Sequence, residues 1–334
     1  MLLALLSSIC LFRNFIYMAQ SEGYLRSVEA SLSVTNGYPI WKLFQSRVLG
    51  PYTIKILSFA SSDAYMAAHI TFHIVAVAIA GFLCWRLGRK YGGNDQSALL
   101  ALTVFISCFA LIIAPPWLYS WDLIDIIVFL FFIDLVLSRA SLVWFLSLFA
   151  VAIWNRDSAN FIALWLIVDP IIRYLNARWQ KLTPIIPFDW RRVIAGLVCI
   201  ATGIILAESL KRNLMIEQIG PKIFPNEPIS ADNRYNIVFG FNMQLLKQSL
   251  TEFDHHFWFI VPALYVLVAT LGLRFTLRDP QRYVSLYVVL LALLMSLVTF
   301  ALFFEMRVYL ILIPFIVIFS VILLRPISAE TKST

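Results

Sequence analysis

Long apolar runs dominate this chain. Stretches of roughly 17 to 25 residues with few charges recur along its whole length, each long enough to cross a bilayer as a helix. Of the 334 residues, 61% are hydrophobic and 13% are charged, whereas a soluble domain is about half apolar and a quarter charged. Only helices or closed barrels satisfy the backbone inside a membrane. The sequence therefore predicts an all-α, polytopic integral membrane helical bundle, with residues 1–334 in a single transmembrane domain.

The apolar runs predict about ten transmembrane helices. The candidate spans are Leu2–Met18, Ala64–Trp85, Ser97–Pro115, Trp121–Leu137, Ser141–Trp154, Ala159–Ile172, Val193–Ala207, Phe257–Leu273, Tyr283–Phe304 and Val308–Leu324. We expect the first run to be a retained span, because no basic segment precedes it and no small-residue cleavage site follows it. Residues 20–63 and 208–256 remain as two long outer loops.

Basic residues predict the orientation of the spans. The net charge of +7 comes from 26 Lys and Arg against 19 Asp and Glu, and many of the basic residues stand in short breaks such as those around Arg86 and Arg274. The positive-inside rule makes these breaks cytoplasmic, and both termini with them. The same rule explains the excess of positive charge, so nucleic acid is not expected as a partner. We expect a bacterial inner (plasma) membrane.

The first outer loop is predicted to hold two amphipathic helices that lie on the membrane surface. Apolar side chains recur four residues apart in two sets, which places each set on one helical face. The two sets are Tyr24, Val28 and Leu32, and then Ile40, Phe44 and Val48.

Several acids lie on the predicted outer side. Glu22 stands where the chain leaves the first span, so it is either a partly desolvated general base or a hydrated acid at a helix start. Asp122 and Asp125 are spaced i, i+3 at the start of the fourth span. This pair could share a proton or bind a cation, whereas Asp122 alone could cap the helix.

Arginines also gather on this side of the membrane. Arg47 lies in an apolar stretch and either grips a phosphate or anchors the chain among lipid headgroups. Arg156 and Asp157 interrupt the apolar stretch between the fifth and sixth spans, facing either a wet cavity or solvent. Glu305 and Arg307 sit in a turn with almost no loop, where charges need partners.

The histidines His69 and His73 are spaced i, i+4 in the second span. This spacing suits either a shared metal ion or a polar contact between helices. The sequence contains no Walker A loop, dinucleotide fingerprint, GxSxG or HExxH motif, so chemistry on soluble nucleotides is not expected.

The layout resembles the GT-C class of glycosyltransferases, which move a sugar from a polyprenyl-phosphate carrier to an acceptor. The resemblance lies in Gln20 to Tyr24 directly after the first span, in the surface helices of the next loop and in the outward-facing charges. The chain is also similar to a bacterial multispan family with an Arg-x-Leu-x-Pro segment, an Asn-Arg-Asp/Glu turn and a Glu-x-Arg motif. These correspond to Arg47 to Pro51, Asn155 to Asp157 and Glu305 to Arg307.

The resemblance implies an inverting membrane glycosyltransferase that acts on the extracytoplasmic face. Glu22 would act as the base on the acceptor hydroxyl, with Asp122 as a second catalytic candidate. The carrier phosphate or the sugar would be bound by Arg47, Arg156, Asp157, Glu305 and Arg307. The implied partners are membrane lipids, a polyprenyl-phosphate-linked sugar donor and a glycan, lipid or protein acceptor.

No cofactor is required by this prediction, although a divalent cation is a candidate. The first outer loop has no DxD motif, so metal dependence stays open. The alternatives are a transporter or flippase for a lipid-linked or small anionic substrate, and a membrane assembly subunit without turnover.

Overall fold

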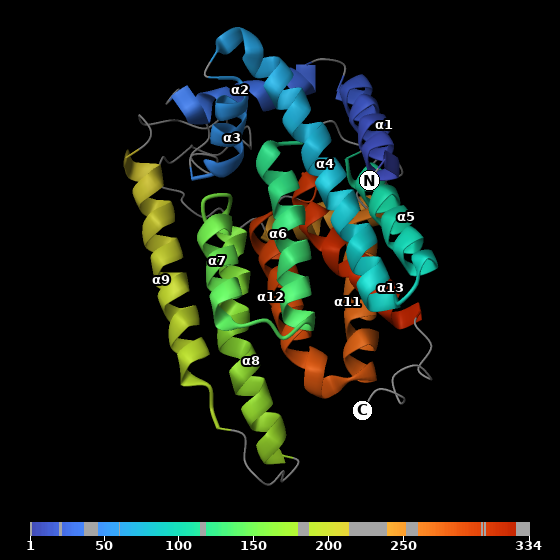
Figure 1. Ribbon diagram of the computed structural model, residues 1–334, viewed down its shortest axis with the longest axis vertical. Coiled ribbons are helices and arrows are strands. Elements are labelled where there is room, and N and C mark those ends of the chain that lie inside the picture. The colour runs from blue at the N-terminus through green and yellow to red at the C-terminus, as the bar shows by residue number, and fades with distance from the viewer. Residues whose placement is uncertain are drawn as a thin grey trace.

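The computed structural model describes residues 2–19, 22–36, 46–59, 61–113, 118–179, 187–213, 239–251, 260–301, 303 and 305–324. Within these ranges the chain is helical and has no strand. The helices are α1 (Leu2–Ala19), α2 (Glu22–Asn36), α3 (Leu49–Leu57), α4 (Ser62–Gly92), α5 (Asp95–Ile112), α6 (Ser120–Leu137), α7 (Leu142–Ala152), η1 (Asp157–Ala159), α8 (Asn160–Trp179), α9 (Trp190–Asn213), α10 (Phe239–Thr251), α11 (Ile260–Arg278), α12 (Pro280–Phe300), η3 (Met306–Leu312) and α13 (Ile313–Leu324). Figure 1 shows them as one elongated bundle.

Seven helical segments of the described chain are long and apolar enough to cross a membrane. They are Asp63–Gly92, Asp95–Ile112, Asp157–Arg178, Trp190–Leu210, Val261–Arg278, Tyr283–Phe300 and Met306–Leu324. This composition is compatible with an integral membrane protein, as the apolar runs predict. The structure does not confirm the predicted number of about ten.

The other three predicted spans correspond to α1, α6 and α7. Helix α6 is strongly apolar but carries Asp122, Asp125 and Asp134. Helix α7 has only 11 residues, which is about 16 Å of helix and too short for a hydrocarbon core of about 30 Å. The predicted fifth span is therefore at most a partial crossing, whereas the sixth is longer than predicted, because α8 continues to Trp179.

The last span is not a continuous α-helix. It begins with the 3-10 segment η3, all seven residues of which are buried, and only then continues as α13. Side chains in a 3-10 helix eclipse every third residue, so such a segment is unusual at this length. Apolar composition alone does not distinguish it from an α-helix.

Helix α4 shows how the core is built. Its buried side chains recur every three or four residues, which aligns them on one face of an α-helix. That face contains Tyr65, His69, His73, Ala76, Ala80, Leu83 and Leu87. It packs against α1, α5, α6 and α13.

The helices α2 and α3 lie together at one end of the bundle, the upper end in Figure 1. Several helices end in basic residues at the opposite end. Arg89 and Lys90 lie in the last turn of α4, Arg178 in the last turn of α8 and Arg278 in the last turn of α11. This distribution agrees with the positive-inside rule if the lower end faces the cytoplasm.

The apolar face of α2 does not lie on a membrane surface. Tyr24 and Val28 are buried in the same core as α1 and α4, and Leu32 packs against that core. An interior and a bilayer are equally apolar, so the spacing of these residues could not distinguish the two. In the second set, Val48 is buried just before α3, and Ile40 and Phe44 lie outside the described residues.

An ion pair at the basic end joins α6 to α4. The ammonium group of Lys90 lies 2.6 Å from Asp134 Oδ1, and the Tyr91 hydroxyl donates to the same oxygen at 2.6 Å. The Lys90 and Asp134 side chains are 41% and 17% exposed, so this ion pair contributes at most about 1 kcal/mol to stability. The opposite end of α6 carries the candidate site.

Candidate functional site

The first two turns of α6 present two acids to the interior of the bundle. The backbone N–H of Tyr119, the residue before the helix, donates to Asp122 Oδ2 at 3.1 Å. Asp122 therefore caps the start of α6, and Asp125 follows one turn later on the same side. Asp122 is fully buried and Asp125 is 2% exposed. Buried carboxylates require positively charged or hydrogen-bonding partners.

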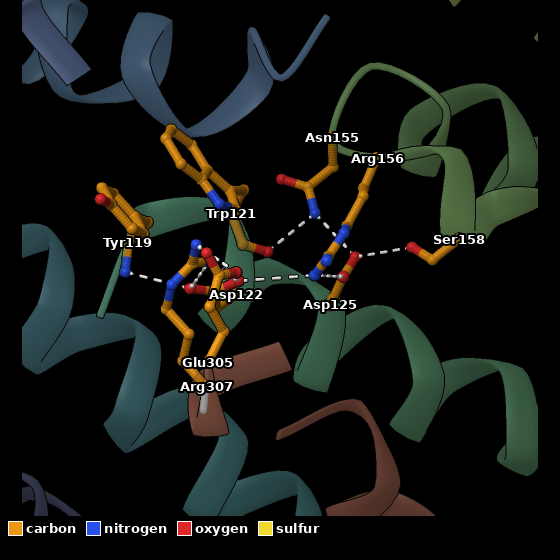
Figure 2. A network of polar contacts seen from close by, with 9 residues as sticks. All are labelled: Tyr119, Trp121, Asp122, Asp125, Asn155, Arg156, Ser158, Glu305 and Arg307. Carbon is orange, nitrogen blue, oxygen red and sulfur yellow. Dashed lines mark hydrogen bonds and ion pairs between the residues drawn. The ribbon is translucent and has the colours of Figure 1, made fainter. Parts of the chain in front are cut away.

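Arg307 binds the first of these acids from the opposite end of the sequence. Its Nη1 donates to Asp122 Oδ1 at 3.3 Å and to Oδ2 at 3.2 Å, and its Nη2 donates to Glu305 Oε2 at 3.2 Å (Figure 2). Glu305 directly precedes η3, and Arg307 is the second residue of η3. Arg307 is 4% exposed, so it holds its charge inside the protein through these contacts.

Arg156 bridges both acids of α6. Its Nη1 lies 3.5 Å from Asp122 Oδ1 and 3.3 Å from Asp125 Oδ2. The residue belongs to the turn between α7 and η1, which reaches over the start of α6 in Figure 2. We call Asp122, Asp125, Arg156, Glu305 and Arg307 the acid–arginine cluster.

Two polar neighbours orient this turn. Asn155 Nδ2 donates to the Trp121 carbonyl at 2.9 Å and to Asp125 Oδ1 at 2.8 Å. The Ser158 hydroxyl donates to the same carboxylate oxygen at 3.1 Å. Asn155 is fully buried, and its Oδ1 accepts no hydrogen bond from the described residues. This oxygen is therefore available to a ligand hydroxyl or to water.

The start of α3 is docked onto the same turn. The backbone N–H groups of Val48 and Leu49 both donate to the Trp154 carbonyl at 3.0 Å. These contacts satisfy donors at the N-terminus of α3 and a carbonyl that follows α7. They bring Arg47, which precedes α3, to the segment that carries Arg156.

A glycine allows α3 to approach α6 closely. Gly50 lies in the first turn of α3, and a Cβ atom built there would collide with the Ser120 side chain at the start of α6. Any larger residue must therefore push the two helices apart. The position of Arg47 over α6 depends on this close contact.

Four side chains form a stack beside the cluster. The guanidinium carbon of Arg47 lies 5.4 Å from the ring centre of Trp121, and that of Arg307 lies 4.3 Å from the ring centre of Tyr119. The two rings are 4.6 Å apart and nearly parallel, with an interplanar angle of 9°. Aromatic faces attract cations, so the stack partly stabilises both arginines.

The charge of Arg47 is disfavoured in this environment. Burial lowers the pKa of Arg47 to about 9, and the positive charges of Arg156 and Arg307 act in the same direction. The carboxylates of Asp122 and Asp157 oppose this effect but do not cancel it. Arg47 is thus held close enough to Arg156 and Arg307 for their charges to disfavour its own. An anion bound among them would relieve that repulsion.

No protein-family model, curated protein or solved structure matches this chain.

The structure brings most of the predicted site residues to one place. Asp122, Arg156, Glu305 and Arg307 share the acid–arginine cluster, and Arg47 lies beside it. Asp157 is exposed and begins η1. Glu22 begins α2, but its side chain lies outside the described part of the structure.

The acids of α6 are bound by arginines. Among the described residues, no three or more His, Cys, Asp or Glu side chains gather where they could hold a metal ion. Asp122 and Asp125 share Arg156, and Asp122 also binds Arg307.

Four residues of the site were not predicted from the sequence: Tyr119, Trp121, Asn155 and Ser158. The last two flank the predicted Arg156 and Asp157, so a polar turn between two apolar runs was the available signal. The two aromatic residues resemble ordinary residues at a membrane interface, where Tyr and Trp are common. Only their packing against Arg47 and Arg307 distinguishes them.

Proposed function

We propose that this protein is a membrane glycosyltransferase that takes its sugar from a polyprenyl-phosphate donor. The main support is the convergence of Arg47, Arg156 and Arg307, because the two other arginines disfavour the charge of Arg47 and a bound anion would offset that effect. Arginine is well suited to phosphate because its planar group donates two parallel hydrogen bonds. The site lies at the end of the bundle opposite the basic helix ends, which is the predicted outer face (Figure 1).

The reaction would be a single inverting displacement at the anomeric carbon. The acceptor oxygen forms a bond to that carbon as the bond to the phosphate oxygen breaks, and the electron pair leaves with the polyprenyl phosphate. The proton of the acceptor hydroxyl goes to a carboxylate base. The arginines stabilise the charge that develops on the departing phosphate.

The roles of the two acids named as catalytic differ. The oxygens of Asp122 already accept hydrogen bonds from Arg307, Arg156 and the Tyr119 N–H, so we assign Asp122 to positioning the arginines. Glu22 remains the proposed base. It begins α2, and α2 lies at the same end of the bundle as the cluster.

A binding experiment tests the phosphate site directly. Purified protein in nanodiscs should bind polyprenyl phosphate more tightly than the polyprenol of the same length, which has the same tail and no phosphate. Arg47→Gln should remove most of that preference. Equal binding of the two lipids would overturn the proposal.

A turnover experiment tests the transferase reaction. A donor with a labelled sugar, incubated with the protein and a membrane extract that supplies acceptors, should release polyprenyl phosphate and pass label to a product. Glu22→Gln should slow this release by about 10²- to 10⁴-fold, the usual contribution of a general base, while lipid binding persists. Glu29→Gln is the matched control, because Glu29 is an exposed acid on the same helix.

Other outcomes would favour the alternatives. Movement of intact donor across proteoliposome membranes without cleavage would indicate a flippase. Absence of both cleavage and transport, with normal folding of the Glu22→Gln protein, would indicate an assembly subunit.

A further inference from the structure

Two histidines lie inside the bundle at a place that the proposed function does not use. His69 and His73 are both fully buried on the inner face of α4. They lie 7 and 11 residues from the start of the helix, or roughly 10 to 17 Å along its axis. Ionisable residues within a membrane span are costly, so they commonly have a function.

One nitrogen of each ring already has a partner. His73 Nδ1 lies 2.8 Å from the His69 carbonyl oxygen, and because that oxygen can only accept, Nδ1 carries the proton. His73 Nε2 is therefore a lone-pair donor in the neutral ring. His69 Nδ1 lies 2.9 Å from the Tyr24 hydroxyl, which fixes the orientation of the second ring.

The other nitrogen of each ring has no partner among the described residues. The Nε2 atoms of His69 and His73 are both buried and make no hydrogen bond there. Leaving a buried polar atom unsatisfied costs about 1 to 3 kcal/mol, so two such atoms in adjacent turns call for a common explanation. The centres of the two rings lie 4.2 Å apart, with an interplanar angle of 32°, so the imidazoles are neighbours on one face of α4.

We propose that His69 and His73 bind a divalent first-row transition-metal ion, with Zn²⁺ as the best fit. Histidines that ligate metals typically donate their other ring N–H to a carbonyl or a similar group, as His73 does. The i, i+4 spacing is also the one by which two helical histidines share a zinc ion. Imidazole nitrogens suit Zn²⁺, whereas Mg²⁺ and Ca²⁺ require oxygen ligands.

The surroundings suit a site of this kind. The ring of Phe12 lies 5.7 Å from that of His73, as does the ring of Phe72, so aromatic side chains surround the His73 imidazole. No third His, Cys, Asp or Glu side chain of the described residues joins the two histidines, so water or a bound ligand would complete the coordination.

The inference can be tested independently of any transferase activity. Tag-free protein, stripped with a chelator and titrated with Zn²⁺ in a calorimeter, should bind about one equivalent. His73→Gln and His69→Gln should each weaken binding by more than about 100-fold, because loss of a ligand costs more than loss of a group that hydrogen-bonds to a ligand. The chain has four histidines, so the matched control is the double substitution His255→Gln and His256→Gln, which should leave binding unchanged.

A second measurement needs no substitution and so does not depend on how the variants fold. X-ray absorption of the wild-type protein with one equivalent of Zn²⁺ should show scattering from two imidazoles. Absence of Zn²⁺ binding, loss of binding in the His255 and His256 variant alone, or a spectrum without two imidazoles would each overturn the inference. None of these results bears on polyprenyl phosphate binding.

Discussion

The strongest test of the acid–arginine cluster is the energetic coupling between Asp122 and Arg307. The two residues are 185 positions apart in the sequence, and Arg307 Nη1 lies 3.3 and 3.2 Å from the two carboxylate oxygens. Asp122 is fully buried and Arg307 is 4% exposed, so neither charge can turn to water if the other is removed. We predict that Asp122→Asn and Arg307→Met each destabilise the protein strongly.

The size of the expected loss in unfolding free energy follows from the burial of the two residues and from the partners that each keeps in the variants. Removing one partner of a buried ion pair typically costs about 3 to 5 kcal/mol. Here Arg307 would keep Glu305, and Asp122 would keep Arg156, so we expect each single substitution to cost about 3 kcal/mol. The double variant leaves neither charge unpaired. The double variant should therefore lose less unfolding free energy than the two single variants together, with a coupling energy of about 1 to 3 kcal/mol.

The assay is a double-mutant cycle on reversible unfolding in mixed detergent micelles. The control cycle uses Arg89→Met and Asp95→Asn, because Arg89 Nε lies 3.1 Å from Asp95 Oδ1 but the side chains are 60% and 76% exposed. An exposed pair of this kind should couple by less than about 1 kcal/mol. If Asp122 and Arg307 couple no more strongly than this control pair, the cluster is not the buried electrostatic unit described above.

Three further substitutions probe the surroundings of the cluster. Gly50→Val should cost about 1 to 3 kcal/mol in unfolding free energy by overpacking against Ser120, whereas Gly240→Ala, which meets nothing within 4 Å, should not destabilise. Polyprenyl phosphate affinity should be constant from roughly pH 7, where the phosphate is already doubly charged, and should fall above about pH 9 as Arg47 loses its proton. In lipid-binding titrations, Arg47→Gln should abolish this decrease in affinity at high pH. A decrease that persists in the variant would contradict the assignment of Arg47 to the phosphate site. Asn155→Leu should cost about 1 to 3 kcal/mol in thermal or chemical unfolding by deleting two buried hydrogen bonds, and an unchanged midpoint would contradict the role given to the turn.

The sequence alone determined the helical membrane architecture and the local pairings. Apolar runs leave the backbone no alternative to helix in a bilayer, and helical periodicity aligns residues three or four apart. Asp122 with Asp125, and His69 with His73, were therefore predictable as neighbours. The clustering of basic residues between the apolar runs was also predictable from the sequence.

Contacts between distant segments were decided only by the tertiary structure. Arg47 reaches the cluster because the start of α3 docks on the Trp154 carbonyl, and no local pattern around either segment encodes that contact. In the same way, η3 and the turn before it bring Arg307 to Asp122. Long-range pairing depends on how helices pack, which the spacing of residues within one helix does not specify.

The apolar face of α2 marks the boundary between what the sequence and the structure determine. Periodicity predicted correctly that Tyr24, Val28 and Leu32 share one face, but it assigned that face to lipid, whereas they pack on the core. A bilayer and a protein interior both exclude water, so the same side chains suit either. Only the packed structure specifies which of the two surrounds a given face.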